Sequence, residues 1–141
     1  MTAPGRVLAL DVGKARMGVA VSDPDRRVAL PAGTIRVVGG IQDLRAVARL
    51  VERYEAAEVV VGHPLSLSGE RGSAARHAEE LADGLRAILD VPVHLQDERL
   101  STVEAERGLA AAGARGPDRR RSVDQAAASL ILRAYLDRTA G

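Results

Sequence analysis

The chain has 141 residues, of which 46% are apolar and 28% are charged, a composition that fits one globular domain over residues 1–141 and excludes a disordered or membrane-spanning chain. It contains no cysteine, which excludes disulfides, thiol catalysis and thiolate metal sites. Its net charge is only +1, so the case for nucleic-acid binding has to rest on local clusters of charge.

Short apolar runs predict strands in the first part of the chain. Residues 6–11 (RVLALD) and residues 17–22 (MGVAVS) are separated by a glycine-containing turn, which predicts a hairpin. A third extended stretch is expected over residues 28–38, with interruptions near Pro31 and Gly33. Further along, two more apolar runs predict buried strands at residues 58–62 and 91–96.

Apolar residues at helical spacing predict helices between and after these later strands. The first two helices cover about residues 44–54 and 74–88. Two capping boxes, S-T-V-E at residues 101–104 and S-V-D-Q at residues 122–125, predict that two more helices begin there, with a basic loop over residues 115–121 between them. The inner faces are expected to contain Ala74, Ala78, Leu81, Ala82, Leu85 and Ile88 in the second helix and Val123, Ala126, Ala127, Leu130, Ile131 and Ala134 in the last.

This order of three strands followed by alternating helices and strands predicts an α/β fold. A meander followed by such units gives a mixed five-stranded sheet with helices on both faces. The N-terminal segment lacks the features of a signal peptide, so secretion is not expected.

Three acidic residues occupy positions where a site is expected to form. Asp11 ends the first strand, Glu98 follows the last strand, and Asp124 lies in the predicted first turn of the last helix, where the helix dipole favours an acid. In open α/β sheets, sites form outside the carboxyl ends of the strands. Each acid also has an ordinary structural interpretation, and Asp23, a further candidate ligand, has the sequence context of a turn.

Carboxylates that converge repel one another unless a cation neutralises them. A set of oxygen ligands suits Mg²⁺ or Mn²⁺ rather than zinc. Such ions activate a water molecule and stabilise the leaving oxygen in phosphodiester cleavage. If the three acids meet, the sequence therefore predicts a metal-dependent nuclease with Asp11, Glu98 and Asp124 as catalytic and metal-binding residues.

Four blocks of the sequence resemble the YqgF/RuvX family of pre-16S rRNA nucleases, which is related to Holliday junction resolvases. The blocks are LDVGKARMGVAVSD at residues 10–23, VGHPLSLSG at 61–69, DERLSTVEA at 97–105, and VDQAAA with ILRAYLD at 123–137. His63 and Ser66 depart from the usual family residues in the second block. The resemblance implies a ribonuclease H-like fold, a cytoplasmic location, and trimming of the 5′ end of pre-16S rRNA, with the family's acidic residues at Asp11, Glu98 and Asp124.

Basic residues close to these acids are candidates for nucleic-acid contacts. Lys14 and Arg16 lie in the turn after Asp11, and Arg99 follows Glu98. Each of them has a simpler alternative as an exposed or ion-paired residue. The basic loop, with Arg115, Arg119, Arg120 and Arg121, either grips a nucleic-acid backbone or is merely solvated. Ser101 and Thr102 are expected to act as capping residues, and His63, His77 and His94 show no metal-ligand spacing.

Three other functions stay open at the level of the sequence. An ATP-binding protein of the actin or sugar-kinase type would need two lobes, and the length argues against it. A non-catalytic RNA-binding assembly factor would keep the fold without using the acids. A Holliday junction resolvase would act on branched DNA as a symmetric dimer. The expected partners are therefore pre-16S rRNA in a pre-ribosomal particle, or branched DNA, with the protein a monomer or a homodimer and no membrane partner.

Overall fold

The computed structural model describes residues 4–65, 69, 71–97 and 116–140, and for residues 116–123 it describes the backbone alone. Within these residues it has five strands and three helices. The strands are β1 (Arg6–Val12), β2 (Arg16–Ser22), β3 (Ala29–Arg36), β4 (Ala56–His63) and β5 (Val93–Asp97), and the helices are α1 (Gly40–Tyr54), α2 (Ser73–Ile88) and α4 (Gly116–Thr139).

The five strands form one mixed sheet in the order β3-β2-β1-β4-β5. Strands β1, β2 and β3 pair antiparallel, and β4 and β5 run parallel to β1. This confirms the predicted mixed five-stranded sheet and the predicted hairpin. Because β1, β4 and β5 run in the same direction, their carboxyl ends meet at one edge of the sheet.

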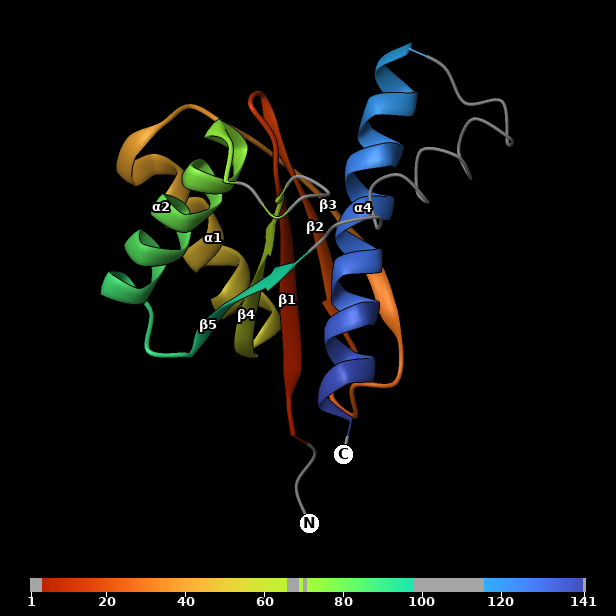
Figure 1. Ribbon diagram of the computed structural model, residues 1–141. Helices are drawn as coiled ribbons and strands as arrows, with labels where there is room; N and C mark the ends of the chain where they lie inside the picture. Colours follow the sequence, from red (N-terminus) through yellow and green to blue (C-terminus); the bar gives the residue numbers. More distant parts are fainter. Residues whose placement is uncertain (1–3, 66–68, 70, 98–115, 141) are drawn as a thin grey trace.

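Alternation along the strands divides the core into two layers. In β1, Leu8 and Leu10 are buried in the layer under α1 and α2, whereas Val7 and Ala9 are buried in the layer under α4. Figure 1 shows α1 and α2 on one side of the sheet and α4 on the other, as predicted. A strand that is buried on both faces reads as a continuous apolar run, which is why the first strand is easily found in the sequence.

Helix α2 packs through a slightly different face from the one predicted. Ala75 is fully buried, whereas Ala74 is exposed and Ile88 is 43% exposed. The predicted inner positions 78, 81, 82 and 85 are buried. The inclusion of Ala74 and Ile88 was wrong because each lies at the margin of the helical stripe, one at the first turn and one at the last residue.

Helix α4 begins at Gly116, six residues before the predicted start at Ser122. Pro117 is its second residue, and proline is favoured in a first turn because it has no backbone N–H to leave unpaired and its φ is already helical. The predicted loop over residues 115–121 is therefore wrong from Gly116 onward, and the backbone of Arg119–Arg121 is helical. Asp124 is the ninth residue of the helix, so the dipole of the first turn does not act on it.

The face of α4 that packs on the sheet also differs in part from the predicted face. Ala127 and Ile131 are buried as predicted, but Ala126, Leu130 and Ala134 are only partly buried. The remaining buried positions of the helix are Ala128, Leu132, Tyr135 and Leu136, which were not in the predicted face. Asp124 precedes Ala128 by one turn and Ile131 by two, so it lies on the face of α4 that is turned toward the sheet.

A polar cluster holds the C-terminal half of α4 against the sheet. Glu58 of β4 accepts hydrogen bonds from the hydroxyl of Tyr135 (2.9 Å) and the ring of His94 (3.1 Å), and it pairs with Arg26. His94 also stacks on Tyr135, with the ring centroids 5.9 Å apart. Burial acts to raise the pKa of Glu58, but the contacts with Tyr135, Arg26 and His94 outweigh it and lower the pKa below its ordinary value. The cluster therefore favours the charged carboxylate and fixes α4 on the sheet.

The described residues contain no helix that is both long enough and apolar enough to cross a bilayer.

Candidate active site

Asp11 lies at the carboxyl end of β1, on the side of the sheet that α4 covers. Val7 and Ala9 point into the layer under α4, and the alternation of the strand puts Asp11 on the same face. Its Cα partner across the hairpin is Gly18 of β2. Residues directly opposite each other in antiparallel strands share a face, so position 18 also faces α4.

Asp124 packs directly over Gly18. A Cβ atom at position 18 would lie 2.0 Å from the backbone oxygen of Asp124 and 3.0 Å from its Cβ atom. Only a glycine permits helix α4 to approach β2 this closely. Gly18 was not among the predicted site residues, although a glycine inside an apolar strand is a recognised sign that another backbone comes close.

These two contacts bring the carboxylates of Asp11 and Asp124 into one site. Opposite Cβ positions on antiparallel strands are about 5 Å apart, and the Cβ of Asp124 is 3.0 Å from the Cβ position of Gly18. The Cβ atoms of Asp11 and Asp124 are therefore within about 8 Å of each other. Side chains whose Cβ atoms are this close can turn both carboxylates toward one ligand.

Arg16 occupies one side of this site through an ion pair with Asp124. Its Nε donates to Oδ2 of Asp124 at 3.0 Å, and the two side chains are 27% and 24% exposed. The predicted phosphate contact of Arg16 thus competes with an intramolecular partner. The guanidinium offsets the negative charge that Asp124 brings toward Asp11.

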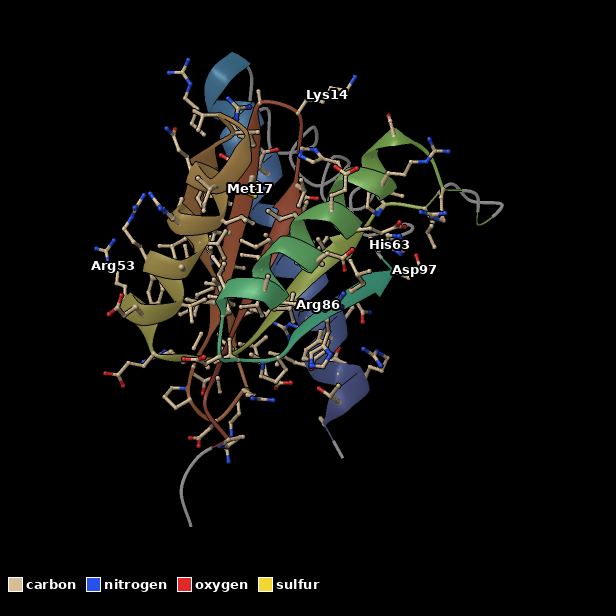
Figure 2. The ribbon with its side chains drawn as sticks, turned by 90° about the vertical axis from the view of Figure 1, so that its left-hand side faces the viewer. Lys14, Met17, Arg53, His63, Arg86 and Asp97 are labelled. Atoms are coloured by element: carbon tan, nitrogen blue, oxygen red, sulfur yellow. The ribbon has the colours of Figure 1, made fainter. Side chains whose placement is uncertain are left out.

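The third predicted acid, Glu98, lies outside the described residues, as do Arg99 and Arg115. Strand β5 is described as far as Asp97, which is exposed. Asp97 lies opposite His63 of β4 in the register of the two parallel strands. Figure 2 shows His63 and Asp97 close together at the ends of their strands. Since β1 and β5 run parallel, the chain leaves β5 at the same edge of the sheet at which Asp11 lies.

The donors brought together are carboxylate oxygens, which fit Mg²⁺ or Mn²⁺. In the part of the chain that the structure describes, no group of three histidine or acidic side chains could hold a metal ion. A full ligand set made of Asp11, Asp124 and Glu98 therefore remains a prediction that depends on Glu98.

Other predicted basic residues lie around this edge. Lys14 is exposed in the turn between β1 and β2, and Figure 2 shows it at the tip of that hairpin. The backbone of Arg119–Arg121 forms the turn of α4 that precedes Asp124.

Asp23, the further candidate ligand, lies at the opposite edge of the sheet, after the end of β2. Its Oδ1 accepts hydrogen bonds from the backbone N–H groups of Arg27 (2.7 Å) and Val28 (2.8 Å). The bond from Val28 is the main cause that lowers the pKa of Asp23 below its ordinary value. Its role as a turn residue is thus what the structure shows, and its position excludes it from the site with Asp11.

His63 forms an ion-paired group on the other face of the same edge. Its Nε2 lies 2.6 Å from Oε2 of Glu79 in α2, and Arg71 forms a two-point pair with the same carboxylate. The hydrogen bonds from Arg71 and His63 lower the pKa of Glu79 to about 2. This group ties the end of β4 and the residues before α2 to the helix. The contact of His63 with an acid was not predicted.

A surface hollow of about 370 Å³ lies away from these residues, between the first turn of α1 and the middle of α2. It contains none of the predicted site residues, and it opens on the face of the sheet opposite to Asp124. Its lining includes Gly40, Ile41, Asp43, Leu44, His77 and Glu80.

Comparison with known sequences identifies the family of this chain. The model of the family described as "RuvX: Holliday junction resolvase" matches residues 5–138. A protein of Roseiflexus sp. (strain RS-1) is 43% identical over 134 residues, which cover 95% of both chains, and one of Mycobacterium ulcerans (strain Agy99) is 49% identical over 137 residues, covering 96% of this chain and 81% of that protein. Both carry the name "Putative pre-16S rRNA nuclease".

Solved structures agree on the fold. RuvC of T. thermophilus, in complex with a Holliday junction substrate, matches with a TM-score of 0.57 at 17% identity over 95% of this chain and 96% of that chain. A resolvase of Fowlpox virus, in complex with Holliday junction DNA, matches with a TM-score of 0.55 at 14% identity over 94% and 97%. The predicted ribonuclease H-like fold is confirmed by these matches, and the predicted nuclease class is confirmed by the family and the relatives. The chain belongs to the RuvX family.

Proposed function

We propose that this protein is a metal-dependent nuclease that hydrolyses phosphodiester bonds and processes the 5′ end of pre-16S rRNA. The observation that carries the proposal is the approach of Asp124 to Asp11 across Gly18, at the edge where parallel strands end. The names of the relatives support RNA as the substrate. The site is open to solvent at this edge, since both Arg16 and Asp124 are partly exposed.

Asp11, Asp124 and Glu98 would hold one or two Mg²⁺ or Mn²⁺ ions. A bound ion of this kind activates water and neutralises the charge on the phosphate. The contribution of the chain is to hold the carboxylates in place before the ion arrives: β1 and β2 fix Asp11, and the close contact at Gly18 fixes Asp124.

Basic residues at the same edge would bind the nucleic-acid backbone. Lys14 is exposed at the tip of the hairpin, and we propose that it and Arg119–Arg121 contact phosphates, with Arg99 and Arg115 in the same role. Arg16 would serve both partners, pairing with Asp124 in the free protein and contacting phosphate when nucleic acid binds. With only two tyrosines and no phenylalanine or tryptophan in the chain, backbone and shape are the features left for recognition.

A second candidate function is the resolution of branched DNA. The family description and the fold likeness to RuvC favour it. Cutting two strands of a junction symmetrically requires two active sites, so this function needs a homodimer. Processing of pre-16S rRNA needs one site, and we propose that it takes place in the cytoplasm on the pre-ribosomal particle.

The experiment that tests the function gives the purified protein two substrates, an RNA that carries the extended 5′ end of pre-16S rRNA and a four-way DNA junction. Each is incubated with Mg²⁺, with Mn²⁺ and with a chelator. Cleavage that requires metal and is lost in Glu98→Gln, but kept in the control Glu52→Gln on the exposed side of α1, supports the nuclease. The preferred substrate decides between the two candidates, and cleavage in chelator would contradict the metal dependence.

A further inference from the structure

Arg36, the last residue of β3, lies directly across from Arg16 of β2. The two are Cα partners in the antiparallel register. Directly opposite residues point to the same face of the sheet, and the side chain of Arg16 reaches Asp124 of α4. Arg36 therefore points to the α4 face at the same edge of the sheet as the candidate active site.

The backbone holds this edge in a fixed relation to the hairpin tip. The N–H of Val37 donates to the carbonyl of Ala15 at 2.9 Å, which continues the pairing of β3 beyond Arg36. The N–H of Gly13 donates to the carbonyl of Arg16, also at 2.9 Å, which closes the turn that carries Lys14. These two hydrogen bonds connect the β1–β2 turn with the end of β3, and this part of the backbone contains Lys14, Arg16 and Arg36.

The charges of these residues are not balanced within the described part of the protein. Arg16 has the carboxylate of Asp124, but among the described residues no carboxylate lies within 4.0 Å of the guanidinium of Arg36, which is exposed. Like charges directly opposite on neighbouring strands destabilise a sheet. An anion that binds between Arg16 and Arg36 would relieve this repulsion, and a guanidinium forks well onto a phosphate.

We propose that Arg36 is a phosphate-binding residue that positions the nucleic-acid backbone beside the candidate active site. The inference rests on the proposed function for its ligand, a phosphodiester backbone. Opposite residues on these strands have Cα atoms about 5 Å apart, so Arg16 and Arg36 can hold phosphates that are close neighbours along one strand. Arg36 acts on the substrate backbone away from the carboxylates and is a positioning residue.

The test measures binding of a fluorescent single-stranded RNA in chelator, so that no cleavage occurs, over a series of salt concentrations. Arg36→Gln is expected to weaken binding severalfold and to reduce the slope of log affinity against log salt by about 0.7, the value for one lost phosphate contact on a single strand. Arg36→Lys should keep most of the slope, since it keeps the charge. The melting temperature of Arg36→Gln should equal or exceed that of the wild type, because a like-charge pair is removed.

Arg53 provides the matched control. It is an exposed arginine at the end of α1, on the other face of the sheet, and Figure 2 shows it at the outer side of that helix. Arg53→Gln should leave affinity and slope unchanged. The inference would be overturned if Arg36→Gln kept the wild-type salt slope. It would also be overturned if Arg36→Gln and Arg53→Gln lost the same amount of RNA affinity.

The failure of this inference differs from the failure of the proposed function. A wild-type protein that binds RNA with a slope that depends on Arg36, but never cleaves it with metal, would support the phosphate contact and contradict the nuclease. If the wild-type protein cleaves RNA with metal, but Arg36→Gln binds RNA as tightly and with the same salt slope, the nuclease is supported and the phosphate contact of Arg36 is contradicted. Absence of any RNA binding by the wild type would overturn both.

Discussion

The backbone of Asp124 rests on Gly18, so that helix α4 and strand β2 meet with no side chain between them. Gly18 is the strand partner of Asp11. One glycine therefore sets the separation between two carboxylates that lie more than a hundred residues apart in the chain. The arrangement joins the packing of α4 to the geometry of the site, because any shift of the helix away from β2 moves Asp124 away from Asp11.

Gly18→Ala is expected to abolish most nuclease activity. The added Cβ would lie 2.0 Å from the backbone oxygen of Asp124, so α4 must move. We also expect a loss of stability of about 1–3 kcal/mol from the overpacking, measured by urea unfolding. Gly72→Ala is the control, because position 72 has open space for a Cβ and a φ of −88°. An active and stable Gly18→Ala protein would refute the close contact.

Arg16→Gln is expected to tighten the binding of Mn²⁺. In the free protein the guanidinium occupies Oδ2 of Asp124 and repels a cation that would bind there. For a partly exposed pair the repulsion is about 1 kcal/mol, or about fivefold in affinity. Titration calorimetry of Mn²⁺ binding measures the effect, with Arg27→Gln at the opposite edge as a control. If Arg16→Gln binds Mn²⁺ no more tightly than the wild type, Asp124 is not a ligand that Arg16 competes for.

Tyr135→Phe is expected to lower the free energy of unfolding by about 1.5 kcal/mol, since it removes a hydrogen bond to a charged group. The lost bond is the one from the Tyr135 hydroxyl to Glu58, and the pKa of Glu58 should rise because the bond helps to keep it low. Tyr54→Phe serves as the control, since Tyr54 is partly buried and is not part of the Glu58 cluster. Equal stability losses in the two variants would show that the Glu58 cluster does not hold α4.

Glu79→Gln is expected to remove a pH-dependent part of the stability. The folded pKa of Glu79 is about 2 against an ordinary value of 4.5, so its ion pairs stabilise the fold fully above about pH 4.5 and are lost as the pH falls toward 2. The stability difference between wild type and Glu79→Gln should therefore shrink over that window in urea unfolding. The exposed neighbour Glu80→Gln should show no such window. A difference that stays constant between pH 5 and pH 2 would contradict the assigned pairs with Arg71 and His63.

Much of the fold could be predicted because its signals are local. Strand β1 is buried on both faces and reads as an apolar run, and the turn after it contains a glycine, so the hairpin could be predicted. The start of α4 was missed because two local signals compete: the capping box at Ser122 suggests a start, while Pro117 is suited to an earlier first turn.

The site was predictable only in part, since its geometry depends on contacts between distant elements. Asp11 could be placed at a strand end from the sequence. The position of Asp124 depends on how α4 rotates on the sheet, and the predicted inner face was partly wrong. The ion pair of Arg16 with Asp124 depends on how the helix packs, and the position of Arg36 opposite Arg16 depends on the strand register. No local pattern in the sequence encodes either of them.

The most direct test of the metal-dependent site is the cleavage of RNA by Asp11→Asn in Mn²⁺. The control is Asp25→Asn, an exposed acid in the turn at the opposite edge of the sheet. Both variants should melt like the wild type, because the substitution is nearly isosteric. We predict that Asp25→Asn cleaves normally and that Asp11→Asn does not cleave. A folded Asp11→Asn protein that cleaves RNA at the wild-type rate would contradict the assignment of the active site.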